Sequence, residues 1–169
     1  MTLRLILTRH AKSSWDDPAM PDHERPLNAR GRRAADALGA WLASRGDLPD
    51  EVLCSDAART RETWARIAPS LECSPVLGVT PGGLYLAGPE TMLAELRCAV
   101  GRVVMMIGHN PGIAEFAAMI VARPPAEPEF RRYPTGATLV VTFEADSWPD
   151  IGPGEGAVVD FITPRALDA

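Results

Sequence analysis

Short apolar runs alternate along this chain with longer segments whose apolar residues recur at helical spacing. The apolar runs predict strands over residues 3–7, 51–54, 76–79 and 103–107. Helical periodicity predicts helices over residues 28–43, 58–68, 89–98 and 113–121, and Pro69 is expected to end the second of them. Two further strands are predicted over residues 137–144 and 157–162, joined by a connection rich in Gly and Pro.

This alternation of strands and helices predicts the fold class. Strands that are connected by helices form largely parallel sheets with helices packed on both faces. We therefore expect an α/β fold with three α/β/α layers around a mostly parallel central sheet. The chain has no internal repeat and no linker-like segment, so residues 1–169 are expected to form a single domain.

Composition and charge narrow the possible partners. Hydrophobic residues make up 46% of the chain and charged residues 23%, as in ordinary globular proteins, and the formal net charge of −5 argues against nucleic acid as the main partner. No segment reads as a membrane span or a signal peptide, so we expect no membrane partner and a cytoplasmic location. The 3 cysteines lack a C-x-x-C pair and are expected to be buried or incidental thiols, with a zinc site as a remote alternative.

Histidines and arginines follow the predicted strands at the point where each strand ends. Arg9 and His10 come after the strand over residues 3–7, His109 after the strand over 103–107, and Arg59 after the strand over 51–54. In an open α/β sheet, ligands bind outside the carboxyl ends of the strands. If these strands are parallel neighbours, their side chains meet at one edge of the sheet.

This set of side chains suits phosphoryl transfer. Guanidinium groups are permanently charged forks that match phosphate oxygens. A neutral imidazole can attack phosphorus and form a covalent phosphohistidine, and a second, protonated imidazole can donate to a phosphoryl oxygen. Because the cations supply the electrostatic stabilisation, no metal and no other cofactor is expected. The chain lacks a Walker-type Gly-rich loop, which favours a phosphomonoester or phosphoramidate over a nucleoside triphosphate.

Four segments resemble the motifs of the histidine phosphatase superfamily, whose fold is phosphoglycerate-mutase-like, and they occur in the family's order. They are Thr8-Arg9-His10-Ala11-Lys12-Ser13, Arg25-Pro26-Leu27 with Gly31, Ser55 to Thr63 with Arg59 inside it, and Gly108-His109-Asn110. The resemblance implies that His10 is phosphorylated and that Arg9, Arg59 and His109 bind the phosphoryl group. Ser13 is implied to add a hydrogen bond.

The short chain and its Arg-His-Ala-Lys-Ser segment are most similar to the SixA-type phosphohistidine phosphatases, the compact branch of this superfamily. This likeness implies an open, shallow site and a phosphohistidine in a protein as the substrate. A small phosphorylated metabolite, handled by a phosphomonoesterase or a mutase of the same superfamily, is the alternative substrate. A phosphate-recognising module without catalysis and a metallohydrolase are alternatives of other classes.

Two positions depart from the superfamily's pattern. Ala11 replaces the glycine of the first motif, and Asn110 stands where many of these phosphatases carry an aspartic acid. A weak general acid hampers departure of an alkoxide. A general acid matters less for the cleavage of a phosphoramidate. The absence of an acid at position 110 therefore favours phosphohistidine as the substrate. Candidates for a replacement acid are Glu90 and Glu95, which match the mutases poorly, and the loop residues Asp16, Asp17, Asp22 and Glu24.

Other polar residues of the motifs and loops have weaker predictions. Arg25 is expected either to fix its loop through a carboxylate or to line the pocket as a substrate contact. Asn110 is expected at the pocket as a further substrate contact. His23 lies in a charged loop and is expected to be solvated, and Lys12 is equally consistent with a solvated side chain and a substrate contact. Trp15 is expected to anchor its loop.

Overall fold

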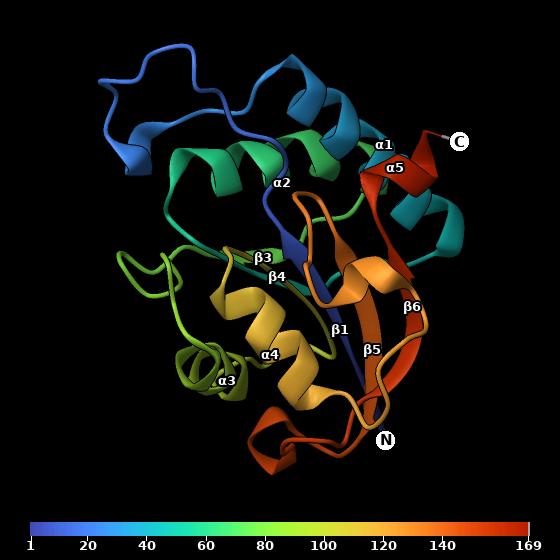
Figure 1. The fold of residues 1–169 in the computed structure, drawn as a ribbon. Coiled ribbons are helices and arrows are strands. Elements are labelled where there is room, and N and C mark those ends of the chain that lie inside the picture. The colour runs from blue at the N-terminus through green and yellow to red at the C-terminus, as the bar shows by residue number, and fades with distance from the viewer. Residues whose placement is uncertain (169) are drawn as a thin grey trace.

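One mixed sheet forms the centre of this computed structural model, which describes residues 1–168. Its strands are β1 (Thr2–Arg9), β2 (Glu51–Cys54), β3 (Val76–Gly78), β4 (Val103–Gly108), β5 (Thr138–Glu144) and β6 (Ala157–Ile162). They are arranged in the order β3-β2-β4-β1-β5-β6 (Figure 1). The pairs β2–β3, β2–β4 and β1–β4 are parallel, whereas β5 pairs antiparallel with both β1 and β6. The mostly parallel sheet is therefore confirmed, with an antiparallel edge formed by the two late strands.

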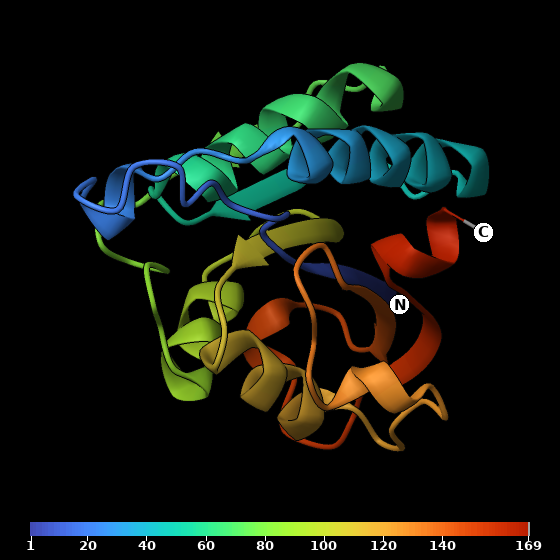
Figure 2. The same cartoon turned by 45° about the horizontal axis from the view of Figure 1, so that its top comes forward.

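Helices cover both faces of this sheet and make the three expected layers. They are α1 (Ala29–Arg45), α2 (Ala58–Leu71), α3 (Pro89–Arg97), α4 (Gly112–Ile120) and the short α5 (Pro164–Leu167). The pair α1 and α2 lies on one face and the pair α3 and α4 on the other (Figures 1 and 2). Within residues 1–168, no helix combines the length and the apolar character that crossing a bilayer requires.

Two hydrophobic cores result, one on each face. Along β1, Ile6 packs with the core beneath α1 and α2, whereas Leu5 and Leu7 pack with the core beneath α3 and α4. Side chains of successive strand residues point to opposite faces. A central strand between two helical layers therefore buries apolar side chains on both faces, which explains why apolar residues dominate these runs of the sequence.

The second helix is longer than its sequence predicts. Pro69 does not end α2, which continues to Leu71 and ends where Glu72 takes a left-handed conformation with φ of 50°. Proline removes one backbone donor from a helix. Here Pro69 is exposed, while Ile67 and Leu71 are buried in the core. Burial of Leu71 offsets the lost hydrogen bond.

Gly31 holds the segment after β1 against the start of α1. The backbone N–H of Asn28 donates to the Lys12 carbonyl (3.0 Å), and the Asn28 side chain accepts from the Gly31 N–H (2.8 Å). A Cβ atom at position 31 would lie 2.1 Å from the Lys12 carbonyl oxygen. Only glycine permits this approach, which accounts physically for the glycine that follows Arg25-Pro26-Leu27.

The replacement Gly31→Ala should push the segment after β1 away from α1. Forcing backbone apart in a packed region costs about 1–3 kcal/mol or more. We expect a loss of that size in the free energy of unfolding, measured by urea denaturation. Gly88→Ala is the matched control, because Gly88 has a φ of −82° and no atom within 4 Å of a Cβ placed there. Equal stability of the two variants would contradict this account of Gly31.

Candidate active site

The parallel pairing of β1 with β4 brings the two strand-end histidines together. Arg9 lies opposite Gly108 in the register, and the backbone N–H of His10 donates to the Gly108 carbonyl (3.1 Å). The ring centroids of His10 and His109 lie 5.3 Å apart, with an angle of 51° between the ring planes. On the other side of β4, the Ser55 N–H donates to the Ile107 carbonyl (3.1 Å) and brings the end of β2 to the same edge.

A pocket of about 220 Å³ opens at this edge. All the site residues expected from the sequence line it except Arg25. The lining consists of Arg9, His10, Lys12, Ser13, Trp15, Asp22, Arg59, His109, Asn110 and Thr135. Three strand ends thus deliver the side chains that the sequence analysis grouped.

His10 is held in one tautomer by its own backbone. Its Nδ1 atom lies 2.7 Å from the Ala11 carbonyl oxygen. A carbonyl only accepts hydrogen bonds, so Nδ1 carries the proton and Nε2 keeps its lone pair. Burial, followed by the positive charges of Arg9 and Arg59, lowers the pKa of His10 to about 4. The ring is therefore neutral at pH 7.

His109 is fixed by a hydroxyl group on the neighbouring strand end. Its Nε2 atom lies 2.7 Å from Ser55 Oγ, and its Nδ1 atom is buried with no hydrogen-bond partner in residues 1–168. Burial lowers the pKa of His109 to about 3, and the charge of Arg59, with that of His10 once its ring is protonated, acts in the same direction. A buried polar atom without a partner is costly unless a ligand satisfies it. This nitrogen is therefore a ready contact for a ligand in the pocket.

The two arginines differ in how they are held. Arg9 donates through Nη1 to the Tyr133 carbonyl (3.1 Å), while its Nε is buried without a partner in the described part of the chain. Burial and the nearby charge of Arg59 lower the pKa of Arg9. Arg59 donates to Asp22 twice, to its carbonyl oxygen at 2.7 Å and to its carboxylate at 3.0 Å. With Lys12, these arginines place three cationic side chains around one small pocket and create a strong local field for an anion, despite the acidic net charge.

Asp22 is the one carboxyl group among the pocket-lining residues. It also accepts a hydrogen bond from the Tyr85 hydroxyl. That bond, together with the hydrogen bond and charge of Arg59, lowers the pKa of Asp22. Asp22 is consequently a carboxylate at neutral pH and a poor proton donor. The other candidate acids lie outside the lining: Asp16, Asp17, Glu24, Glu90 and Glu95.

Tyr85 is a contact that the sequence analysis missed. It lies between β3 and α3, and its ring meets the rings of His109 and His23 edge-on at centroid distances of 5.4 and 4.7 Å. No periodicity marks this segment. Its return to the pocket depends on the tertiary path of the chain.

His23 is not the fully solvated side chain that the sequence predicts, because its ring has partners in the folded chain. Its Nε2 atom lies 2.9 Å from Asp56 Oδ1, and its ring packs on Tyr85. The short helical turn Asp22–Glu24 folds over the start of α2 and brings the ring to these partners.

Arg25 differs from both alternatives expected for it, because within residues 1–168 its guanidinium neither lines the pocket nor pairs with a carboxylate. It donates to the carbonyl oxygens of Ser14, Asp17 and Pro18 at 3.3–3.5 Å. It also stacks on Trp15, with 3.8 Å between its Cζ atom and the ring centroid. Trp15 is 65% exposed and lines the pocket. Arg25 therefore shapes the loop that presents Trp15.

The side-chain amide of Asn110 forms hydrogen bonds to the protein backbone. Its Nδ2 donates to the carbonyl oxygens of Arg132 (2.8 Å) and Tyr133 (3.2 Å), which ties the turn after β4 to the loop before β5. Its Oδ1 is buried and has no partner in residues 1–168. Ser13 pairs with Leu27 in a short antiparallel bridge that fixes the pocket's rim.

Cysteines and acidic residues form no metal site in the part of the chain that the structure describes. No group of three His, Cys, Asp or Glu side chains is arranged to hold an ion among residues 1–168. Burial raises the pKa of the Cys54 thiol to about 12, so this cysteine is an unreactive core residue.

Unfolding should become easier as the pH falls from about 6.5 towards 4. The folded pKa values of His10 and His109 lie below the ordinary value of 6.5, so the unfolded chain takes up protons first. Each histidine can account for up to about 3 kcal/mol of stability that is present above pH 6.5 and lost below it. Chemical denaturation across this pH range measures the loss. The double variant His10→Gln/His109→Gln should show a shallower pH dependence, and an unchanged slope would contradict the buried neutral rings.

Comparison with known proteins places this geometry in a family. Residues 5–78 match the model of the histidine phosphatase superfamily (branch 1). An uncharacterised protein of Mycobacterium tuberculosis is 33% identical over 167 residues, which cover 93% of this chain and 99% of that protein. The structure of the proposed phosphohistidine phosphatase SixA of Nakamurella multipartitia has 31% identity and a TM-score of 0.80, and the match covers 97% of each chain.

A second solved structure shows the same fold at lower identity. It is the protein histidine phosphatase SixA complexed with tungstate, with 21% identity and a TM-score of 0.79 over 98% of this chain and 99% of that one. The resemblance drawn from the four sequence motifs is confirmed by these matches. The chain belongs to the histidine phosphatase superfamily and has a SixA-like fold.

Proposed function

We propose that this protein is a phosphatase that transfers a phosphoryl group to Nε2 of His10 and acts on phosphohistidine in proteins. One observation carries the proposal. The lone pair of a neutral, buried imidazole lies in a pocket that also contains Arg9 and Arg59, while the one carboxyl group of the lining is held as a carboxylate. The pocket is equipped with a nucleophile and cations, but its lining has no carboxylic acid that could serve as a proton donor.

In the first step, the phosphoryl group binds among Arg9, Arg59 and His109. His10 Nε2 forms a bond to phosphorus while the bond from phosphorus to the leaving group breaks. Charge spreads over the phosphoryl oxygens in the transition state, and the guanidinium groups stabilise it there. Because burial and these cations keep His10 neutral, the nucleophile is available without prior loss of a proton.

His109 contributes a neutral donor. When the Ser55 hydroxyl donates to Nε2 of His109, the ring's proton is on Nδ1, the atom that has no partner within residues 1–168. This N–H can donate to a phosphoryl oxygen. The low pKa of His109 argues for this neutral form over the protonated ring expected from the sequence.

The absence of a proton donor favours phosphohistidine over a phosphomonoester. An alkoxide needs a proton as it departs. A phosphohistidine protonated on its second ring nitrogen instead leaves as neutral imidazole, and the phosphoryl group moves between two chemically alike rings with no net proton transfer. Since Asp22 is ionised and Asn110 is not an acid, the pocket suits this exchange.

In the second step, water hydrolyses the phosphoenzyme. The water oxygen bonds to phosphorus, the bond between phosphorus and His10 Nε2 breaks, and both water protons stay on the departing phosphate or pass to solvent. His10 recovers its neutral form with the proton on Nδ1. Arg9 and Arg59 serve both steps, so the proposal requires no metal ion.

The similar proteins support this assignment. The Nakamurella multipartitia relative is a proposed phosphohistidine phosphatase, and SixA was solved with tungstate, an oxyanion like phosphate. A phosphomonoesterase or a mutase would need an acid that the pocket lacks. A binding module without catalysis has no use for a nucleophile held in one tautomer.

Replacement of His10 by alanine should abolish the phosphoenzyme. After incubation with a phosphohistidine peptide labelled with ³²P, the native protein should carry acid-labile, base-stable label, and His10→Ala should carry none. Turnover should fall by at least about a thousandfold, as on removal of other nucleophiles. His23→Ala is the matched control, because His23 lies outside the pocket lining, and it should keep the label.

The native protein should also hydrolyse this peptide with a larger kcat/KM than 3-phosphoglycerate or sugar phosphates. Faster turnover of the monoesters would refute phosphohistidine as the preferred substrate class. Label that persists in His10→Ala would refute the assignment of the nucleophile.

Ser55→Ala should slow the chemical step through His109. Without the hydroxyl, the His109 ring loses the one hydrogen bond that it makes within residues 1–168, and a catalytic group that is no longer held in place typically costs about tenfold or more in kcat. We expect kcat to fall with little change in KM. Ser44→Ala is the control, since the Ser44 hydroxyl is exposed and donates to Trp41 on α1. A Ser55→Ala enzyme with native kcat would show that this hydrogen bond does not position His109.

A further inference from the structure

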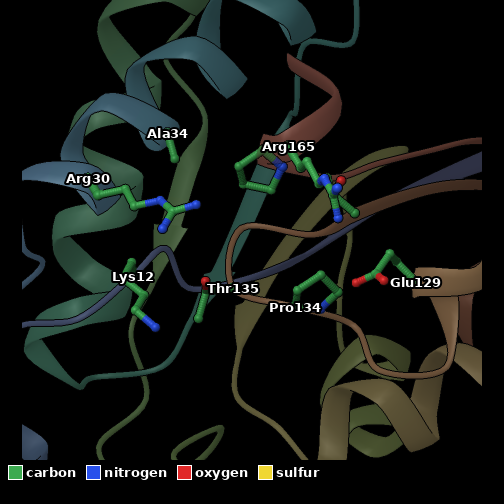
Figure 3. A pocket seen from close by; sticks show the side chains of 9 residues that line it. Lys12, Arg30, Ala34, Glu129, Pro134, Thr135 and Arg165 are labelled. Carbon is green, nitrogen blue, oxygen red and sulfur yellow. The ribbon is translucent and has the colours of Figure 1, made fainter. Parts of the chain in front are cut away.

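A basic groove adjoins the active-site pocket. Its cations are Lys12, which follows β1, Arg30 on α1, and Arg165 on α5, and they surround a hollow of about 210 Å³ (Figure 3). Glu129 also lines this hollow, on the side of Arg165 and across from Lys12 and Arg30 (Figure 3). Three elements that are distant in sequence thus place positive charge around one concave surface.

The basic groove lies directly beside the pocket that holds His10. Lys12 and Thr135 line both hollows. At its far end, Arg30 and Arg165 also line a further hollow of about 130 Å³, which adds Arg33. A ligand can therefore extend from the phosphoryl pocket past Lys12 towards α1 and α5.

The cations of the basic groove are uncompensated. Within residues 1–168, the side chains of Lys12, Arg30, Arg33 and Arg165 make no ion pair or hydrogen bond, and all four lie around the two adjoining hollows. Glu129 lies 3.6 Å from Arg132, which offsets its charge, and among residues 1–168 Asp168 is the one carboxylate that lines the far hollow. In a chain with a net charge of −5, this local excess of positive charge calls for an anionic partner.

Arg30 occupies a position that disfavours a cation. It lies in the first turn of α1, which contains no acidic residue. The N-terminal end of a helix carries partial positive charge and favours anions. The chain therefore keeps a cation where it costs stability, and an anion bound in the groove would offset that cost.

We propose that the basic groove binds acidic side chains that flank the phosphohistidine of a substrate protein. The groove is lined by Ala34, Pro134 and Pro164 between its cations, a surface that accommodates methylene groups of Glu and Asp side chains and a peptide backbone. Its length exceeds what one phosphoryl group fills, because two hollows follow the active-site pocket. The groove selects substrate proteins by the negative charge of the residues that flank their phosphohistidine. This inference rests on the proposed phosphohistidine phosphatase function.

The test compares two synthetic phosphohistidine peptides of equal length. One carries Glu residues on both sides of the phosphohistidine, and the other carries Gln at the same positions. We expect the native enzyme to prefer the Glu peptide by about 3- to 10-fold in kcat/KM, mainly through KM, as for a few partly exposed ion pairs. The preference should shrink in about 0.5 M NaCl, where the screening length is about 4 Å.

The double variant Arg30→Gln/Arg165→Gln should bring the ratio of the two kcat/KM values close to one. Arg66→Gln removes one positive charge from α2, outside every hollow described above, and should keep the native ratio and the native turnover. A native enzyme that shows equal kcat/KM for the two peptides would overturn the proposal, and so would a ratio that the double variant leaves unchanged.

A binding measurement separates this inference from the proposed function. His10→Ala prevents turnover, and fluorescein-labelled peptides carrying a phosphonate triazole in place of phosphohistidine report affinity by fluorescence polarisation. If the native enzyme hydrolyses neither peptide but His10→Ala binds the Glu peptide more tightly through Arg30 and Arg165, the function fails and the groove stands. If only small bisphosphorylated compounds show a dependence on Arg30 and Arg165, the acidic polypeptide is the wrong occupant.

Discussion

Parallel pairing of β1 with β4 is the constraint from which the site follows. The register sets Arg9 opposite Gly108 and delivers both histidines to one edge of the sheet. A shift of one residue would move every side chain of β1 to the opposite face. Ile6 on one core and Leu5 and Leu7 on the other resist that shift, because each of these side chains is buried in a helix-covered layer. Hydrophobic burial in the sheet therefore fixes the positions of polar groups at its end.

The pocket combines two demands that oppose each other. Two imidazole rings are buried beside guanidinium groups, and both burial and positive charge favour their neutral forms. The same charges that keep the rings neutral attract an anionic ligand. A site built in this way holds a neutral imidazole at His10 but leaves polar atoms of Arg9 and His109 without partners within residues 1–168. These unpartnered polar atoms lower the stability of the folded protein at the place where a ligand binds.

The sequence was sufficient for the architecture and for most of the pocket, because both depend on strong local signals. Apolar runs locate the strands, and strand ends locate the residues that can meet. Tyr85 and the fixed position of Arg25 could not be read in this way, since both lie in segments without periodicity whose paths depend on tertiary contacts. The prediction that α2 ends at Pro69 was wrong for a related reason. Proline disfavours the helix locally, but burial of Leu71 in the core outweighs that local cost. His23 looked like a solvated loop residue, and only the folded chain shows its partner Asp56.

The contact between Asp22 and Arg59 has a consequence for the release of product in the proposed phosphatase reaction. Arg59 is already bound twice by Asp22, so an incoming oxyanion must compete with an internal carboxylate for this guanidinium. That competitor is always present at high effective concentration, whatever the level of free phosphate in solution. It weakens the grip on inorganic phosphate as much as on substrate and can recapture Arg59 when the product leaves. A tethered counter-ion of this kind limits product inhibition.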